Sequence, residues 1–277
     1  MNLLLSLFTC AVSFAYVPEY SMIANHAADQ HGKGAYFIEQ EVTFKKDAEV
    51  YVIKESWLIA SEYGMRVTLE GRGALKGLVQ GTMIYDGSQR HFVEAGSPNI
   101  RTVRLGDDWL EPLFHFRNAK YFRSRLVTLK VTPAESVHDR APLPATGDLK
   151  YEAPGFIRLS RVGGSTAWAI GVPPSVGVAP TLWLEQDQFI LRKFRGADQA
   201  ILRAGDYAKF DDGLWFPRQR SYSFGGYSID VQTLRVRALG KLKPDDKSFK
   251  TSNLNVAKDG LKLPDAEALK EFYSRFR

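Results

Sequence analysis

The stretch Pro180–Phe194, PTLWLEQDQFILRKF, decides how this chain folds. Two apolar runs, Leu182–Leu184 and Phe189–Leu191, flank a short polar turn, which is typical of a β-hairpin. A hairpin with one face toward water alternates apolar and polar residues, whereas this hairpin carries apolar side chains on both faces. We therefore expect something apolar to cover the second face as well, either more protein or a ligand.

Upstream of this hairpin, residues 35–94 show the period of two that is typical of strands. The clearest example is GMRVTLEG, in which Met65, Val67 and Leu69 alternate with polar residues. Short turns separate this stretch from its neighbours, as in hairpins. The segment therefore predicts an antiparallel meander of about five strands.

Strand patterns resume at Tyr151 and bring the expected total to about ten strands. Three segments favour helices: Val17–His31, then Gly106–Val131 with a break near Asn118, and a short C-terminal helix opened by Pro264. Ten strands present more apolar face than such helices can cover. The sheet must therefore close, form a sandwich or curve around something else. The residues alone leave open whether the interior is an open cavity or is filled by the helix around Phe114 and Phe116.

The N-terminus resembles an export signal. An apolar run ends in the small residues Ser13 and Ala15, which predicts a cleaved signal peptide at residues 1–15 and a single domain at residues 16–277. If Cys10 leaves with the signal, the mature chain has no cysteine, which excludes disulfides and thiolate sites.

One segment inside that domain looks like an insertion. The Pro-rich stretch TPAESVHDRAPLPATGD, at residues 132–148, predicts a surface loop. Strand patterns resume directly after it, so it does not mark a domain boundary.

No arrangement of residues suits catalysis or metal binding. GGSTA at 163–167 lacks the final glycine of a nucleophile elbow and lies in a predicted hairpin. His26 and His31 would lie about 140° apart around a helix, so we expect a solvent-facing pair and no shared metal. We expect no enzyme activity, no cofactor and no metal ion.

The net charge of +6 permits weak attraction to anionic surfaces. The basic run between Arg117 and Lys130 is interleaved with aromatic residues, but export argues against nucleic acid as a partner. Transient contact with an anionic membrane surface is the remaining interpretation of this run.

Two motifs resemble the LolA/LolB-like superfamily of bacterial envelope proteins, the outer-membrane lipoprotein-sorting type. The first is the opening hairpin, and the second is DYAKFDDGLWFPRQRSYS, which follows it. The matched residues are Pro180, Trp183, Leu184, Glu185 and Arg192 in the first motif, and Gly213, Pro217 and Arg218 in the second. The order of elements resembles the family over most of residues 16–277. The loop at 132–148 is extra, and Glu185 stands where aspartate is common.

This resemblance implies a mainly β (α+β) fold: one strongly curved antiparallel sheet that forms an unclosed half-barrel, lidded by a few helices. It also implies that the concave apolar face holds acyl chains without catalysis. We expect a monomeric periplasmic carrier or binder of acylated lipoproteins or other lipidic ligands. The alternative is an envelope sensor or scaffold that binds another protein through the same fold. The side chains expected to line the cavity are Trp57, Met65, Val67, Leu69, Met83, Tyr85, Trp183 and Phe189.

Overall fold

The computed structural model describes residues 17–46, 49–62, 64–138, 154–171, 173, 178–242, 246–255 and 259–277. The predicted signal peptide, residues 1–15, lies outside the described residues, and so does the part of the predicted loop from residue 139 onward.

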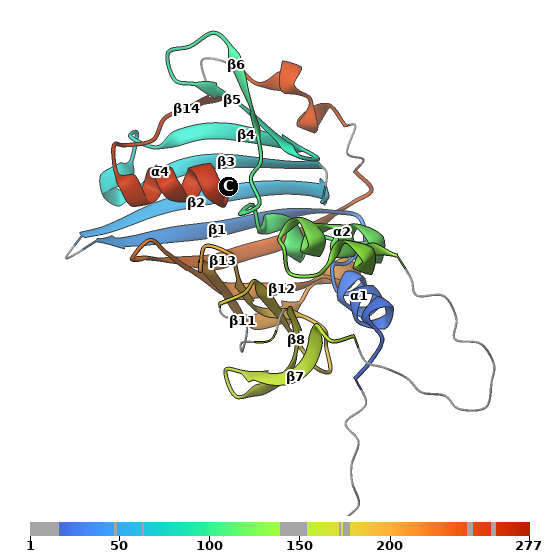
Figure 1. The fold of residues 1–277 in the computed structure, drawn as a ribbon. Helices are drawn as coiled ribbons and strands as arrows, with labels where there is room; N and C mark the ends of the chain where they lie inside the picture. The colour runs from blue at the N-terminus through green and yellow to red at the C-terminus, as the bar shows by residue number, and fades with distance from the viewer. Residues whose placement is uncertain are drawn as a thin grey trace, which may run out of the picture.

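The first half of the sheet is the predicted meander (Figure 1). Its alternating residues form five consecutive antiparallel strands, and two short edge strands pair with the last of them. These strands are β1 (Ala35–Lys46), β2 (Glu49–Ser61), β3 (Gly64–Arg72), β4 (Gln80–Asp86) and β5 (Gln89–Glu94), with β6 (Ile100–Arg104) and β14 (Gly260–Leu261) at the edge.

The second half is a run of seven strands that ends at β7, and the pairing of β1 with β13 joins it to the first half. Every pair in the sheet is antiparallel except that of β14 with β5. The strands are β7 (Ile157–Val162), β8 (Ser165–Gly171), β9 (Thr181–Glu185), β10 (Leu191–Arg195), β11 (Ile201–Lys209), β12 (Trp215–Phe224) and β13 (Tyr227–Gly240).

The described sheet thus has fourteen strands rather than the expected ten or so. Part of the difference is physical, because β6 is almost wholly exposed and β14 has only two residues, so neither shows an alternating pattern. The expected architecture is confirmed: one strongly curved sheet, not closed into a barrel, with a few helices on it.

Three α-helices are described: α1 (Tyr20–Asp29), α2 (Ala119–Thr128) and α4 (Glu267–Arg275). The predicted break near Asn118 is confirmed, because its side chain accepts a hydrogen bond from the Lys120 amide and begins α2. In Figure 1, α1 and α2 lie together near one end of the sheet, and α4 lies over β2 and β3. The 3₁₀ turns are η1 (Gly73–Leu75), η2 (Glu111–Phe114), η3 (Ala134–Val137), η5 (Asp211–Gly213), η6 (Lys247–Phe249) and η7 (Thr251–Asn253).

The opening hairpin, β9 and β10, buries apolar side chains on both of its faces. Leu182 and Leu184 belong to the main apolar core, whereas Trp183 belongs to a separate small cluster with Ala167 and Ala169. We call the face of the sheet that carries the main core the inner face, and the opposite one the outer face. Within the described residues, no helix is long and apolar enough to cross a membrane.

Candidate functional site: the filled inner face

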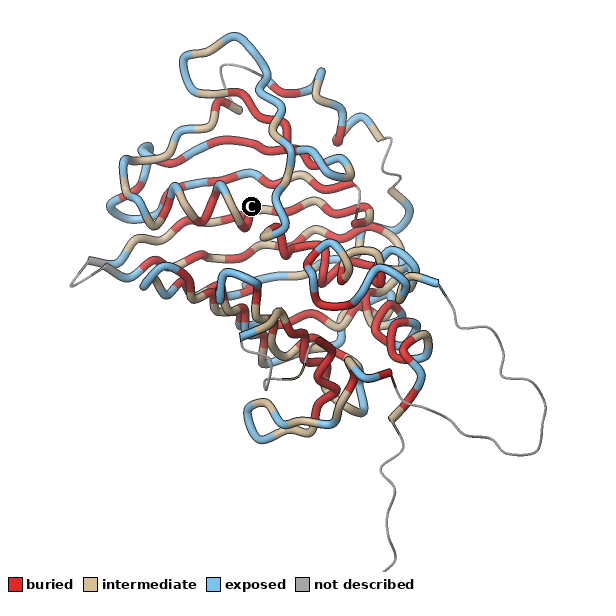
Figure 2. The backbone as a smooth tube through the Cα atoms, viewed as in Figure 1, coloured by how far each residue is buried: buried red, intermediate tan, exposed pale blue. Residues whose placement is uncertain are grey.

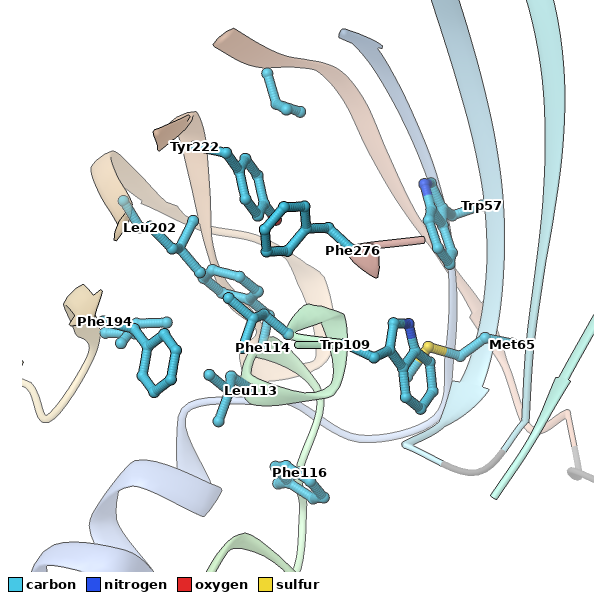
Figure 3. Close-up of a cluster of buried hydrophobic side chains, with 14 of the residues drawn as sticks. Trp57, Met65, Trp109, Leu113, Phe114, Phe116, Phe194, Leu202, Tyr222 and Phe276 are labelled. Atoms are coloured by element: carbon cyan, nitrogen blue, oxygen red, sulfur yellow. The ribbon is translucent and has the colours of Figure 1, made fainter. Parts of the chain in front are cut away.

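The inner face of the sheet is one continuous apolar surface. Figure 2 shows buried positions running along the strands of both halves and recurring along α4, where they alternate with exposed ones. Side chains from strands at both ends of the sheet belong to the same core cluster, as do side chains of all three helices. Figure 3 shows its centre, where Phe276 points toward Tyr222, and Trp109 lies beside Met65.

Helix α4 covers part of this face with aromatic rings. Its buried residues, Phe272 and Tyr273, follow Leu269 by three and four positions and so lie on one side of the helix. Phe272 meets Phe44 and Tyr222 edge-to-face, with ring centroids 5.4 and 5.3 Å apart, and Phe276 lies 4.9 Å from Phe224. Burial of one such side chain contributes about 1.5–3 kcal/mol, so these rings account for most of the docking of α4.

The segment from Trp109 to Phe116 fills the next part of the face. Trp109 stacks on Tyr85 with their ring centroids 5.1 Å apart, and Phe114 packs on Phe216 at 5.9 Å. A cavity of only about 10 Å³ remains beside this segment, and Leu113 and Phe189 are among the residues that line it. That is no more than the space of one water molecule. The question that the sequence left open therefore has an answer: in this structure the described parts of α4 and of residues 109–116 fill the interior.

Six of the eight residues expected to line a cavity come together on this face. They are fully or almost fully buried, and they belong to the main core. These residues are Trp57, Met65, Val67, Leu69, Met83 and Tyr85.

The other two predicted residues lie elsewhere. Phe189 is half-buried at the edge of the core, where its ring stacks on His26 with centroids 4.8 Å apart. Trp183 lies on the outer face, because the alternation of β9 that turns Leu182 and Leu184 inward turns Trp183 outward. It does not take part in the inner-face surface.

A buried ion network lies between α4 and the sheet. Arg277 directly follows the last turn of α4, and its Nε donates to both carboxylate oxygens of Glu55 in β2, at 3.0 and 3.1 Å. Its Nη1 lies 3.3 Å from a carboxylate oxygen of Glu111 and donates to the Tyr222 hydroxyl at 3.3 Å. The side chains of Arg277 and Glu55 are wholly buried.

A second arginine completes this network. Nη1 of Arg220 donates to both oxygens of Glu111, at 3.0 and 2.9 Å, and its Nη2 donates to the amide oxygen of Gln40. Gln40 in turn donates to Glu55. Two carboxylates and two guanidinium groups balance one another, as buried ions must in an apolar core.

The network fixes the charge states of Glu111 and Arg277. Burial alone would raise the pKa of Glu111, but Arg220 and Arg277 hold it well below its usual value. Burial would lower the pKa of Arg277, but Glu55, Tyr222 and Glu111 raise it well above its usual value. Glu111 and Arg277 therefore stay charged at neutral pH, and their attraction ties the end of α4 to η2.

Arg90 in β5 holds α4 from another side. Its Nη1 donates to the backbone carbonyl oxygens of Tyr273 and Arg277. The last carbonyl groups of a helix have no partner inside the helix, and a cation there also interacts favourably with the helix dipole. Polar contacts thus hold the C-terminal end of α4, and aromatic packing holds the rest of the helix.

The sequence contained a sign of this network, because two charged residues occupy positions that the alternation assigns to the apolar side of a strand. Glu55 occupies the apolar side of β2, in step with Ile53 and Trp57, and Arg220 is in step with Tyr222 in β12. A charged residue in the apolar phase of a strand predicts a buried partner of opposite charge. The identity of that partner depends on tertiary structure.

The expectation that His31 faces solvent is wrong. Helix α1 ends at Asp29, and the chain then turns His31 inward, where it is 8% exposed and donates from Nδ1 to the carbonyl oxygen of Phe116. Burial lowers the pKa of His31 to about 3, so the ring is neutral. Among the described residues, no group of three or more His, Cys, Asp or Glu side chains could hold a metal ion.

An unclosed sheet curved around its own helices, with an apolar inner face, defines the LolA-like class of folds, and this chain has that fold. A DUF1329 family protein from Desulfovibrio piger superposes with a TM-score of 0.53 at 11% identity, covering 85% of this chain and 98% of that one. A LolA superfamily protein from Nitrosomonas europaea superposes with a TM-score of 0.51 at 12% identity, covering 86% and 100%. No family model matches the sequence, and no curated protein matches it significantly.

Proposed function

We propose that the protein is a carrier or binder of lipidic ligands, including acylated lipoproteins, in the bacterial cell envelope. The observation that supports this most directly is the continuous apolar inner face of an unclosed sheet, covered in part by the nine-residue helix α4. A lipid that replaces α4 would bury its own methylenes there at about 0.8 kcal/mol each, in exchange for the ring contacts of the helix and the ion pairs of Arg277. Binding and release then need no catalytic residue.

The acyl chains would contact the side chains that α4 and residues 109–116 now cover. We place Trp57, Met65, Val67, Leu69, Met83 and Tyr85 in that lining, with Phe189 at its margin. Trp183 is left out because it lies on the outer face. In the same proposal, residues 1–15 are a cleaved export signal, and residues 16–277 act as a single periplasmic domain and as a monomer.

Native mass spectrometry of the protein purified from a bacterial periplasm, with lipid extraction of the same sample, tests this function. We expect discrete added masses that partition into organic solvent, and saturable uptake of a fluorescent fatty acid. A double variant, Phe272→Ala with Phe276→Ala, removes two rings from the inner face and should take up more of the fatty acid. Leu234→Ala, at a half-exposed position of β13, is the matched control and should change nothing.

An apo mass without fatty-acid uptake, in the wild type and in the double variant alike, would contradict the carrier. It would favour the scaffold alternative, in which the filled inner face is a permanent core and another envelope protein is the partner.

A further inference from the structure

The outer face of the second half of the sheet carries a row of positive charges. Cross-strand pairing aligns Arg158 of β7, Ala169 of β8, Trp183 of β9, Lys193 of β10 and Arg203 of β11. Direct cross-strand partners project from the same face of a sheet, at about 5 Å per strand. Since Trp183 lies on the outer face, the three cations of this row lie there too.

Arg195 adds a fourth charge, because it follows Lys193 by two residues on the same strand and therefore shares its face. Both cations lie over the indole of Trp183, with Nζ of Lys193 4.8 Å and Cζ of Arg195 5.6 Å from the ring centroid. The indole holds the two side chains in place by cation–π attraction and leaves their charge uncompensated.

Carboxylates do not neutralise this row. Within the part of the chain that the structure describes, no carboxylate oxygen lies within 4.0 Å of a side-chain nitrogen of Arg158, Lys193, Arg195 or Arg203. Arg158 and Arg195 donate instead to the neutral carbonyl groups of Gly171 and Ala179. Burial, followed by the neighbouring charges of Arg203 and Arg195, lowers the pKa of Lys193. The cations therefore repel one another, and an anion placed between them would relieve that repulsion.

A groove of about 700 Å³ opens beside this row. The polar residues that line it are Arg192, Arg203, Gln219, Arg220, Ser221, Asp230 and Gln232, together with Ser165 from the β7–β8 hairpin. Arg203, Ser221 and Asp230 are direct cross-strand neighbours, and so are Gly205, Gln219 and Gln232. Because Arg203 projects from the outer face, these residues place the groove on that face, opposite the buried ion network.

The charge balance in the groove is positive. Its described carboxylate, Asp230, pairs with Lys45 at 2.9 Å. Arg192 lies over the ring of Tyr207, and its buried Nε has no hydrogen-bond partner. Arg192 and Arg203 thus bring two positive charges to the groove, and Lys193, the cross-strand partner of Arg203, lies next to it.

We propose that this groove binds a phosphate ester with a hydroxyl-bearing polar part. Two arginines in the groove and a lysine beside it suit a phosphate monoester of nearly two negative charges better than a single carboxylate, and arginine matches the geometry of phosphate oxygens. The neutral Ser and Gln side chains supply donors and acceptors for hydroxyl groups. The volume falls in the range of small-molecule sites. A phosphate ester with hydroxyl groups occurs as a monoester in a free glycerol or sugar phosphate and, with one negative charge, as a diester in the head group of phosphatidylglycerol.

The test uses glycerol 3-phosphate as the probe for the free ester, titrated into the protein by calorimetry. We expect saturable binding that weakens at least tenfold in Arg203→Gln and in Lys193→Gln and that falls with added salt, whereas glycerol does not bind. Arg104→Gln, which removes the same charge from exposed β6 in the other half of the sheet, is the control and should bind like the wild type. Arg203 is exposed, so its substitution should leave the unfolding midpoint unchanged.

A second arm uses vesicles of phosphatidylcholine with and without phosphatidylglycerol, followed by sedimentation. Binding to glycerol 3-phosphate assigns the site to a free ester, whereas Arg203-dependent binding to the anionic vesicles alone assigns it to a head group. The proposal is overturned if neither probe binds, or if Arg203→Gln and Arg104→Gln behave alike. The inner face has no part in either arm, so the carrier function and this site stand or fall separately.

Discussion

Buried charge is the most informative feature at the scale of single residues. Glu55, Glu111, Arg220 and Arg277 form ion pairs in an apolar core, where each ion loses its hydration. Such a set adds little net stability over an apolar core, but removal of one member leaves another charge buried without its partner. The network is therefore better explained as a device that fixes the position of α4 than as a source of stability.

Glu55→Ala tests this interpretation. Of its two carboxylate partners, Arg277 would keep only Glu111, at the longer distance, so we expect the free energy of unfolding in urea to fall by about 3 kcal/mol or more. Glu70→Ala is the matched control, because Glu70 pairs with Arg72 at the surface of β3 and such pairs contribute less than about 1 kcal/mol. Equal losses in the two variants would show that the buried network does not hold the core.

The buried histidines predict how stability depends on pH. Burial lowers the pKa of His31 and of His115, so both stay neutral in the folded protein at pH values where they take up a proton in the unfolded chain. The unfolded state then binds more protons, and stability falls as the pH drops below about 6.5, by about 1.4 kcal/mol per unit for each histidine.

Urea unfolding at pH 7.0 and 5.5 measures this effect. His31→Asn keeps a donor for the Phe116 carbonyl but cannot titrate. The difference in the free energy of unfolding between the two pH values should therefore shrink by the contribution of His31. His138→Asn, at an exposed position, should leave the difference unchanged. A difference that is the same in all three proteins would mean that His31 is accessible to protons in the folded state.

At the scale of elements, the sequence was sufficient wherever pattern and local chemistry agreed. The alternating residues of 35–94 gave the meander, and the break in the middle segment fell at Asn118 because an asparagine there can cap a helix. Polar and charged residues on the apolar side of a strand were harder to interpret. Their partners come from distant elements, as when η2 supplies Glu111 to Arg220 of β12.

Apart from the network that holds its C-terminal end, helix α4 has little stability of its own. It has only nine residues, and Ala266 at its N-cap makes no side-chain capping bond. An isolated helix of this length is marginal in water, so its structure depends on packing against the inner face. Elements that move in function come from the less stable end of a fold.

Hydrogen exchange should reveal this difference. We expect the amides of α4 to exchange faster than those of β1 and β2, by a local opening. Ala266→Ser adds the missing cap, which contributes about 1 kcal/mol, and should slow exchange in α4 without affecting the two strands. Exchange of α4 at the rate of the central strands, unchanged by the new cap, would identify it as a fixed part of the core.

At the scale of the whole molecule, the sequence indicated a curved sheet but not how its halves meet. The pairing of β1 with β13 joins residues nearly two hundred positions apart, and no local pattern selects one distant partner over another. The same holds for the interior. The sequence pattern around Trp57 is the same whether its ring faces a lipid or, as here, the guanidinium of Arg277.

Whether the filled inner face is one state of a carrier or a permanent core is therefore a question about α4 as part of the whole. Tyr227 donates to Glu267 at 3.2 Å across the surface between β13 and the first turn of α4. The sequence has its one cysteine at position 10, inside the predicted signal, so Tyr227→Cys with Glu267→Cys can be joined selectively by a bis-maleimide linker.

In a carrier, this link should abolish fatty-acid uptake, because a tethered α4 keeps its rings on the surface that the acyl chain needs. The same double variant without linker is the control; it loses the ring contact of Tyr227 with Phe224, at 5.8 Å, but keeps Phe272 and Phe276, and it should still take up the fatty acid. Uptake that survives the link would mean that lipid enters without displacement of α4. The segment at residues 109–116 would then be the part of the molecule that has to open.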